Sequence, residues 1–428
     1  MHDDVTPPRT PTRTLDPAAP AAPRLESPAR AAGPAPWVFR LVVVGLVLAA
    51  LNLRPAITSL GALLEEVRDG LHMSGSVAGV LTSVPPLCFA VFGVMAPRLA
   101  RRFGPGAVVC AGMVAITAGL AIRPLVGGTA GFLAASALAL MGIAVSNVLM
   151  PVIVKRWFPD RVGSMTGLYS MALALGTSLA AAVTVPMTEA MGGSWKAGLG
   201  IWAALAAAAI LPWIPLARDR SGGTGHRAAQ RPEAPALRIT RSRTAWALAC
   251  FFGLQATAAY ITMGWMPQIF RDAGVSAGTA GVLLAVTMAM GVPLAFVIPR
   301  VAARMKNQGP IVVFLGACGL IGYGGLYLAP SGGAWAWALL LGISNCAFPL
   351  ALTMIGMRSR SGAGVVRLSA FAQSTGYLIS IPGPLLVGVL YQHSGGWGLP
   401  IALMAALMVP QMVAGVLAGR DRTIEDEC

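Results

Sequence analysis

Apolar runs of about 20 residues recur along most of the chain, and they limit its fold more than any other feature. Each run is bounded by Gly, Pro or charged residues and is long enough for a helix to cross the hydrocarbon core of a bilayer. We predict twelve spanning helices, at about residues 38–64, 75–97, 105–125, 130–154, 163–189, 196–217, 244–269, 276–299, 309–329, 333–356, 365–391 and 397–418. The composition agrees, because 56% of the 428 residues are hydrophobic and only 11% are charged. The expected fold class is an all-α membrane protein.

The basic residues predict how the helices are oriented. A formal net charge of +15 would suggest nucleic-acid binding in a soluble protein, but here Lys and Arg gather in short loops between apolar runs, so no nucleic-acid partner is expected. Of the 31 Lys and Arg, all but five fall in the N-terminal tail, the even-numbered loops or the C-terminus; the exceptions are Arg54, Arg68, Arg123, Lys196 and Arg271. Because cytoplasmic loops are enriched in basic residues, both termini are predicted to be cytoplasmic, in a multi-pass protein of the plasma membrane.

The chain divides into two halves of six predicted helices. Residues 1–36 are rich in Pro, Ala, Thr and Arg and are predicted to form a disordered cytoplasmic tail. Residues 37–217 and 244–418 form the two predicted six-helix bundles. The basic segment 218–243, rich in Gly and Pro, is predicted to be a cytoplasmic linker, and residues 419–428 a cytoplasmic tail.

An internal repeat relates the halves. Ser76-Val77-Ala78-Gly79-Val80-Leu81 precedes Pro97-Arg98, and Gly278-Thr279-Ala280-Gly281-Val282-Leu283 precedes Pro299-Arg300, both with an offset of 202 residues. Duplicated bundles are typical of secondary transporters, so the repeat favours transport.

The segment Asn52-Leu53-Arg54-Pro55-Ala56-Ile57-Thr58 places a guanidinium inside the first apolar run. We expect Arg54 to be the only ionised residue within the membrane. An Arg there costs roughly 2.5 to 3.5 kcal/mol on insertion scales, and such residues are usually kept for a pathway or a partner. Pro55 lacks an N–H, so it leaves a carbonyl without its helical partner and is expected to break the helix. We predict that Asn52, Arg54 and Thr58 line a cavity for a small anionic solute. In the alternative interpretation, Arg54 only bonds the freed carbonyls of broken helices.

Polar residues of other spans extend the predicted cavity. Asn147 and Asn345 each lie four residues before a Pro, so each offers a free backbone carbonyl as well as its amide. We favour the interpretation that these two Asn residues line the cavity. In the alternative, they only brace neighbouring helices. All 16 Asp and Glu lie in tails, loops or span ends, and the four His lie outside the spans. Simple proton-coupled cation efflux is therefore disfavoured.

The loop Pro97-Arg98-Leu99-Ala100-Arg101-Arg102-Phe103-Gly104 resembles the G-x-L-A-D-R-x-G signature of the major facilitator superfamily, with Pro97 in place of the Gly and Arg101 in place of the Asp. The resemblance covers about residues 38–418. Asn52-Leu53-Arg54-Pro55 and the segment 74–82 are similar to the cyanate and 2-nitroimidazole transporter family within it. This resemblance implies that helices 1, 4, 7 and 10 line a central cavity, with helix 11 beside them. The predicted substrate-binding residues are Arg54, Asn52, Thr58, Asn147, Gln255, Tyr260, Asn345 and Gln373.

Three classes of function are weighed. The first is secondary active transport of a small anionic or polar, cyanate-like solute by alternating access, and the second is export of drug-like or nitroimidazole compounds. The third, a membrane-embedded enzyme, would need a nucleophile with a base, or metal ligands, within the spans, and the sequence contains no such set. No cofactor, metal or catalytic residue is expected. The expected partners are a small solute and the bilayer, a coupling ion is left open, and the protein is expected to be a monomer.

Overall fold

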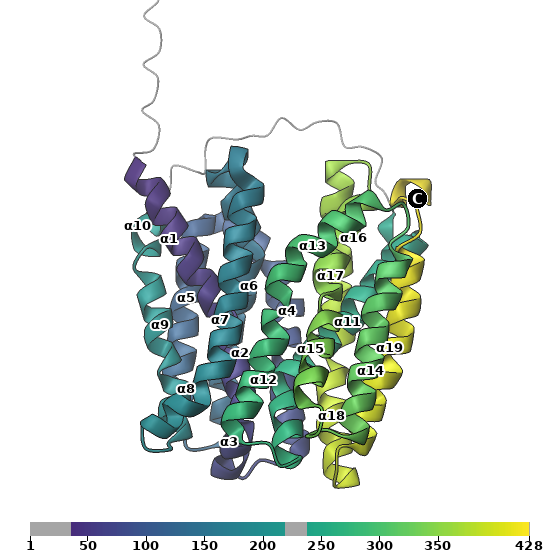
Figure 1. The fold of residues 1–428 in the computed structure, drawn as a ribbon. Helices are drawn as coiled ribbons and strands as arrows, with labels where there is room; N and C mark the ends of the chain where they lie inside the picture. Colours follow the sequence, from purple (N-terminus) through teal and green to yellow (C-terminus); the bar gives the residue numbers. More distant parts are fainter. Residues whose placement is uncertain (1–35, 219–237, 428) are drawn as a thin grey trace, which may run out of the picture.

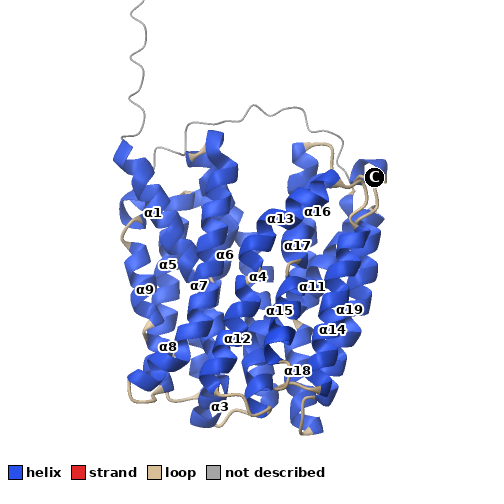
Figure 2. Ribbon diagram, in the orientation of Figure 1, coloured by secondary structure: helices blue, strands red, loops and turns tan. Residues whose placement is uncertain are grey.

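The computed structural model describes residues 36–218 and 238–427, and within these ranges it contains helices and no strand (Figure 2). The predicted N-terminal tail and most of the predicted linker lie outside the described residues. In the described part, eleven helical segments are long and apolar enough to cross a membrane. The remaining predicted span, the sixth, is divided into α8 (Trp195–Gly200), α9 (Trp202–Ile210) and α10 (Trp213–Arg218). The predicted all-α fold with twelve spans is confirmed for the described residues.

Several spans consist of two or three consecutive helices. In the first half, the five spans before the sixth are α1 (Pro36–Asn52) with α2 (Pro55–Ala62), then α4 (Gly75–Phe103), α5 (Pro105–Ile122), α6 (Thr129–Trp157) and α7 (Val162–Ala190). The charged helix α3 (Leu64–Leu71) follows the first span. In the second half, the spans are α11 (Arg243–Asp272), α12 (Ala277–Ala289) with α13 (Gly291–Arg304), α14 (Gly309–Leu328), α15 (Ala334–Asn345) with α16 (Ala347–Met357), α17 (Gly362–Ser380) with α18 (Pro382–Ser394), and α19 (Gly398–Ala418). Three short 3₁₀ helices, η1 (Pro159–Arg161), η2 (Ile239–Arg241) and η3 (Ile424–Asp426), lie outside the spans.

Proline explains the break that matters most here. Pro55 and Pro382 open α2 and α18. At the first position of a helix the missing N–H of Pro costs nothing, whereas inside a continuous helix it removes a hydrogen bond. The predicted break of the first span at Pro55 is therefore confirmed, with Arg54 as the residue that precedes α2.

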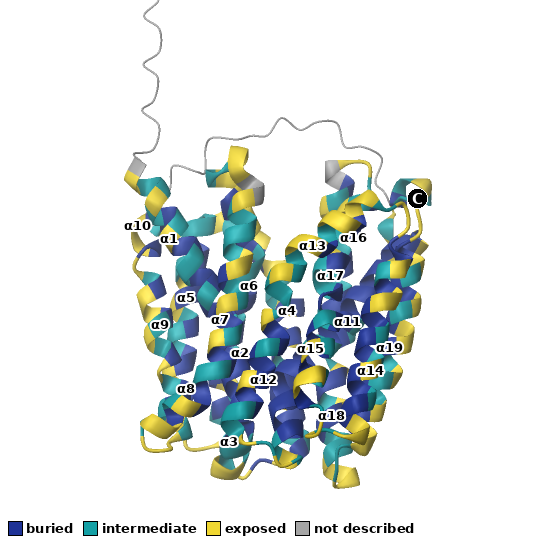
Figure 3. Cartoon of the chain, in the orientation of Figure 1, coloured by how far each residue is buried: buried dark blue, intermediate teal, exposed yellow. Residues whose placement is uncertain are grey.

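The two halves stand side by side (Figure 1). The start of α1, the end of α10, the start of α11 and the C-terminus all lie at one end of the molecule, which we call the terminal end; α3 lies at the opposite or far end. The ribbons of the halves are spread apart at the terminal end and converge toward the far end (Figure 1). Buried residues accordingly gather around α2, α11 and α12 in the lower part of the view (Figure 3).

Glycines allow the halves to meet closely toward the far end. A Cβ added to Gly61 of α2 would lie 2.0 Å from the carbonyl oxygen of Met263 in α11, and one added to Gly79 of α4 would lie 2.9 Å from that of Leu385 in α18. A Cβ added to Gly281 of α12 would lie 2.5 Å from the carbonyl oxygen of Ala181 in α7. Small residues let helix backbones approach in this way. The halves are thus packed backbone against backbone on this side.

Polar contacts also join the two halves at the far end. Arg271 Nη2 lies 2.8 Å from Glu65 Oε2, and Arg271 Nη1 lies 3.0 Å from Glu66 Oε2, so α11 is paired with α3. The Gln392 Oε1 atom of α18 accepts hydrogen bonds from the backbone N–H and the hydroxyl of Ser76 in α4, at 2.8 and 2.7 Å. Both contacts join the first half to the second.

Candidate functional site

A guanidinium lies at the break of the first span, where the two halves meet. Arg54 is half-buried between α1 and α2. Its Cζ atom lies 5.8 Å from the ring centroid of Phe89 in α4, and its guanidinium interacts with the hydroxyl of Tyr260 in α11. Because α4 belongs to the first half and α11 to the second, the charge contacts both bundles.

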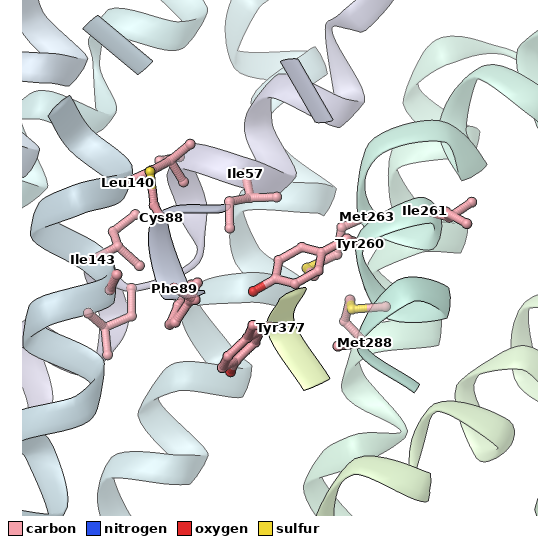
Figure 4. Close-up of a cluster of buried hydrophobic side chains, with 14 of the residues drawn as sticks. Ile57, Cys88, Phe89, Leu140, Ile143, Tyr260, Ile261, Met263, Met288 and Tyr377 are labelled. Atoms are coloured by element: carbon pink, nitrogen blue, oxygen red, sulfur yellow. The ribbon is translucent and has the colours of Figure 1, made fainter. Parts of the chain in front are cut away.

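Three aromatic rings surround this charge. Phe89 stacks on Tyr377 of α17, with ring centroids 5.0 Å apart and an interplanar angle of 25°, and its centroid lies 6.4 Å from that of Tyr260. Figure 4 shows the Tyr260 hydroxyl directed toward Phe89 and Tyr377. We call Arg54, Phe89, Tyr260 and Tyr377 the Arg54 cluster. It combines one permanent cation, two phenol hydroxyls and flat ring faces, which together suit an anion or an electron-rich planar solute.

The backbone around the break explains why Arg54 stays available. Pro55 cannot donate to the Leu51 carbonyl, and Gly176 of α7 packs against that oxygen so closely that a Cβ there would lie 2.2 Å from it. The Arg54 carbonyl accepts from the backbone N–H of Ile57 at 2.9 Å and of Thr58 at 3.1 Å. Within the described residues, no hydrogen bond joins the Arg54 guanidinium to a backbone carbonyl, so the carbonyl-bracing alternative does not describe this conformation.

Of the predicted site residues, Arg54 and Tyr260 are brought together, whereas two others of the first span are not directed into the cluster. The Thr58 side chain is fully buried, and its hydroxyl donates to the Arg54 carbonyl at 3.3 Å. The Asn52 amide donates to the carbonyls of Leu48, at 2.8 Å, and of Leu205 in α9, at 3.3 Å. Asn52 therefore ties the first span to the sixth.

Two predicted residues of the second half bond each other. Gln255 Nε2 donates to the backbone oxygen of Asn345 at 3.0 Å and to its Oδ1 at 2.8 Å, while Gln255 Oε1 accepts from Gln411 Nε2 at 3.1 Å. The carbonyl that Pro349 leaves free is thus satisfied by a side chain from α11. In this conformation Gln255 and Asn345 join α11, α15 and α19, as the bracing alternative expects.

The last two predicted residues lie apart from these contacts. Gln373 is half-buried, and its Nε2 donates to Ser369 Oγ on the same helix at 2.6 Å. Asn147 is half-buried in α6, which continues without a break through Pro151. Within the described ranges, the Asn147 side chain makes no hydrogen bond.

The sequence-based prediction missed one charge and two rings. Arg123, which caps the end of α5, was expected outside the membrane, but it is only 1% exposed and its Nη1 donates to the carbonyl of Ala56 at 3.1 Å. The interior of the first half therefore holds a guanidinium besides Arg54, because a long Arg side chain can turn back from a helix end into the protein. A lone Arg directly after an apolar run was the available signal. Phe89 and Tyr377 gave none, since apolar spans contain many aromatic residues.

Comparison with known proteins gives the family. The sequence model of the Major Facilitator Superfamily matches residues 42–360. The chain belongs to this superfamily. The transporter is 37% identical over 385 residues to the uncharacterized transporter YycB of Bacillus subtilis (strain 168), covering 90% of this chain and 94% of the relative. It is 32% identical to the 2-nitroimidazole transporter of Escherichia coli (strain K12), covering 90% of this chain and 96% of the relative. It is 30% identical to the cyanate transport protein CynX of the same strain, covering 86% of this chain and 94% of the relative.

Solved structures confirm the fold. The nucleoside transporter NupG matches with a TM-score of 0.70 at 14% identity, covering 89% of this chain and 98% of that chain. A D-xylose-proton symporter matches with a TM-score of 0.68 at 13% identity, covering 90% and 100%. The protein is thus a multi-pass membrane transporter of a small solute, with the major facilitator fold, and its relatives are transporters.

Proposed function

We propose that this transporter carries a small anion of the cyanate type, bound at the Arg54 cluster between the two halves. The observation that carries the proposal is the Arg54 guanidinium itself, which lies within the spans and is paired with no carboxylate in the described part of the chain. A partly desolvated cation without a counter-ion attracts an anion, and its planar donors suit a small anion with delocalised charge. Similarity to a protein named for cyanate transport supports this substrate class.

A second candidate substrate is a flat, neutral, electron-rich compound such as a nitroimidazole. The Phe89 and Tyr377 rings stack on each other at 25° beside the cation, so a flat heterocycle could take the place of one ring in this stack. A nitro group would accept hydrogen bonds from Arg54 while the heterocycle packs on a ring face. Similarity to a protein named for 2-nitroimidazole transport favours this alternative.

We further propose that transport proceeds by alternating access, with the terminal end in the cytoplasm of a monomeric plasma-membrane protein. The bias of Lys and Arg toward the terminal end supports this orientation. In the described conformation the far end is closed by the pairing of Arg271 with Glu65 and Glu66 and by the glycine contacts. Opening toward the far end would separate these contacts while the halves rock about the Arg54 cluster.

Uptake into proteoliposomes tests the proposal. Labelled cyanate and labelled 2-nitroimidazole are offered separately to the wild type, Arg54→Ala and Arg54→Lys. Because a hydrogen bond to a charged group contributes roughly 1.5 to 3 kcal/mol, Arg54→Ala is expected to lower cyanate uptake by about tenfold to a hundredfold at limiting substrate. Arg54→Lys is expected to retain part of the uptake, because it keeps the charge but not the planar donors.

Arg304→Ala is the matched control, since Arg304 is an exposed arginine at the end of α13. It should transport as the wild type does. Selective loss of 2-nitroimidazole uptake in Arg54→Ala would favour the second candidate. Unchanged cyanate uptake by a correctly inserted Arg54→Ala variant would refute the proposed function.

A further inference from the structure

Arg123 has a buried guanidinium, and most of its hydrogen-bonding capacity is unused. Its side chain lies in the interior of the first half, where Nη1 donates to the Ala56 carbonyl and Phe132 lies with its ring centroid 5.6 Å from Cζ. Across the described ranges, Nε and Nη2 are buried without a hydrogen-bond partner, and no carboxylate forms an ion pair with this residue. A buried charge with unpaired donors is unfavourable, so a partner not belonging to the chain is expected.

A small cavity lies beside these donors. Its lining comes from α2, α4, α6 and α11 and includes Arg123, Ser136, Thr82 and Tyr260 among apolar side chains. The enclosed space is large enough for about one water-sized guest. The Ser136 hydroxyl is also buried and has no partner within the part of the chain that the structure describes. Two independent polar groups on different helices thus lack partners at the same cavity.

The unpaired groups match an anion better than any other small guest. The Arg123 donors cannot accept a hydrogen bond, and the Ser136 hydroxyl can donate one. The Thr82 hydroxyl is already used, since it donates to the carbonyls of Ala78 and Gly79 and accepts from Trp265 Nε1. The apolar remainder of the lining keeps the local dielectric low, which strengthens attraction between Arg123 and a negative guest. A water molecule would satisfy donors without neutralising the charge.

We propose that this cavity is a second anion site, which holds one small monovalent anion, such as a halide, against Arg123 and Ser136. The site does not depend on what Arg54 binds. Tyr260 belongs to both sites, because its hydroxyl interacts with Arg54 and its side chain lines the cavity. The cavity lies on the far-end side of the Arg54 cluster, since it reaches Gly61 and Gly264, which follow Arg54 and Tyr260 along their spans.

Thermal unfolding of the full-length protein in detergent tests the site. Sodium bromide is titrated at constant ionic strength with gluconate, and the melting temperature is recorded. A ligand that binds only the folded state raises this temperature in a saturable way. We expect saturation in the wild type, apparent affinity weakened by about tenfold or more in Arg123→Gln, and a smaller weakening in Ser136→Ala. Arg123→Lys keeps the charge and should retain part of the response.

Two further variants make the result specific. Arg358→Gln removes another buried arginine, whose donors are already bonded within the protein, so it should keep the bromide response even if its melting temperature falls. Because Arg54 is itself proposed to bind a small anion, Arg123→Gln is also compared in the Arg54→Ala background, where the Arg123-dependent part of the response should remain. If Arg54→Ala still transports cyanate, the proposed function fails, but an Arg123-dependent bromide response would still support the second site.

Anomalous scattering from crystals grown with bromide gives a measurement that does not depend on a variant folding. The expected peak lies within hydrogen-bond distance of Arg123 and Ser136. A saturable response that Arg123→Gln leaves unchanged in the Arg54→Ala background, the absence of any saturable response in the wild type, or a cavity that holds only water in the bromide crystals would each overturn the proposal.

Discussion

Arg123 in the first half and Arg358 in the second are equally buried, at 1% and 2% exposure, yet they are satisfied very differently. Arg358 Nε donates to the Ala418 carbonyl at 2.9 Å, and its Nη2 donates to the Gly419 carbonyl at 2.8 Å and to Gln308 Oε1. Arg123 has one such bond, to Ala56. The burial of a charged residue therefore does not by itself reveal its role. The number of its hydrogen-bond donors that are already bonded within the protein does.

The surroundings give the same contrast. Arg358 follows α16 at the terminal end and joins it to the beginning of α14 and the end of α19, so it fixes three spans of one half. Arg123 reaches the carbonyl directly after Pro55, beside the broken first span and a cavity. We infer that Arg358 is structural and that Arg123 is kept for a guest.

The largest expected effect follows from removing the satisfied arginine. Arg358→Ala leaves two backbone carbonyls and the Gln308 amide without their partner, so we expect the free energy of unfolding to fall by about 3–5 kcal/mol. Circular dichroism, recorded during chemical unfolding in detergent, measures this change in free energy. Arg304→Ala, which removes an exposed arginine, should stay within about 0.5 kcal/mol of the wild type. Equal stability of the two variants would contradict the structural role inferred for Arg358.

A smaller effect is expected where the halves meet. Gly61→Ala places a Cβ on the Met263 carbonyl, so it should destabilise the conformation closed at the far end by about 1–3 kcal/mol. The population should shift toward far-end opening, which spin-label distances across the two halves measure. Gly278→Ala is the matched control, because an added Cβ there meets nothing within 4 Å. Identical distance distributions for both variants would contradict the account of the closure.

The unsatisfied arginine should cost less to remove. In Arg123→Gln the lost hydrogen bond to Ala56 is offset by relief of an uncompensated buried charge, so we expect the free energy of unfolding without added anion to change by less than about 1 kcal/mol. The same chemical unfolding, in gluconate buffer, measures this. A loss as large as that of Arg358→Ala would mean that Arg123 is structural too.

The smallest effect concerns pH at the terminal end. Burial raises the pKa of Glu427, but hydrogen bonds from the Ser242 hydroxyl and from the backbone and side chain of Thr244 outweigh it and hold the pKa below its ordinary value of 4.5. A lowered carboxyl pKa adds stability above the unfolded-state value and loses it as pH falls through the folded-state value. The melting temperature should therefore fall below about pH 4.5 more steeply in the wild type than in Glu427→Gln. Parallel pH profiles would exclude this contribution.

Local features were predictable from the sequence, and long-range ones were not. The spans and the break at Pro55 follow from apolar runs and from the missing proline N–H, which act within a few residues. The contact of Arg54 with Phe89 and Tyr260, and the direction in which Asn52 donates, depend on helices far apart in the chain. Arg123 shows the limit most clearly, because its place directly after an apolar run marked it as unusual but did not fix where its side chain ends.

Equilibrium binding of labelled cyanate to the purified protein tests the central claim most directly. The account predicts saturable binding to the wild type, a dissociation constant raised by about tenfold or more in Arg54→Ala, and an intermediate value in Arg54→Lys. Arg304→Ala should bind as the wild type does. The same dissociation constant in the wild type and in a folded Arg54→Ala variant would contradict the assignment of Arg54 as the anion-binding group.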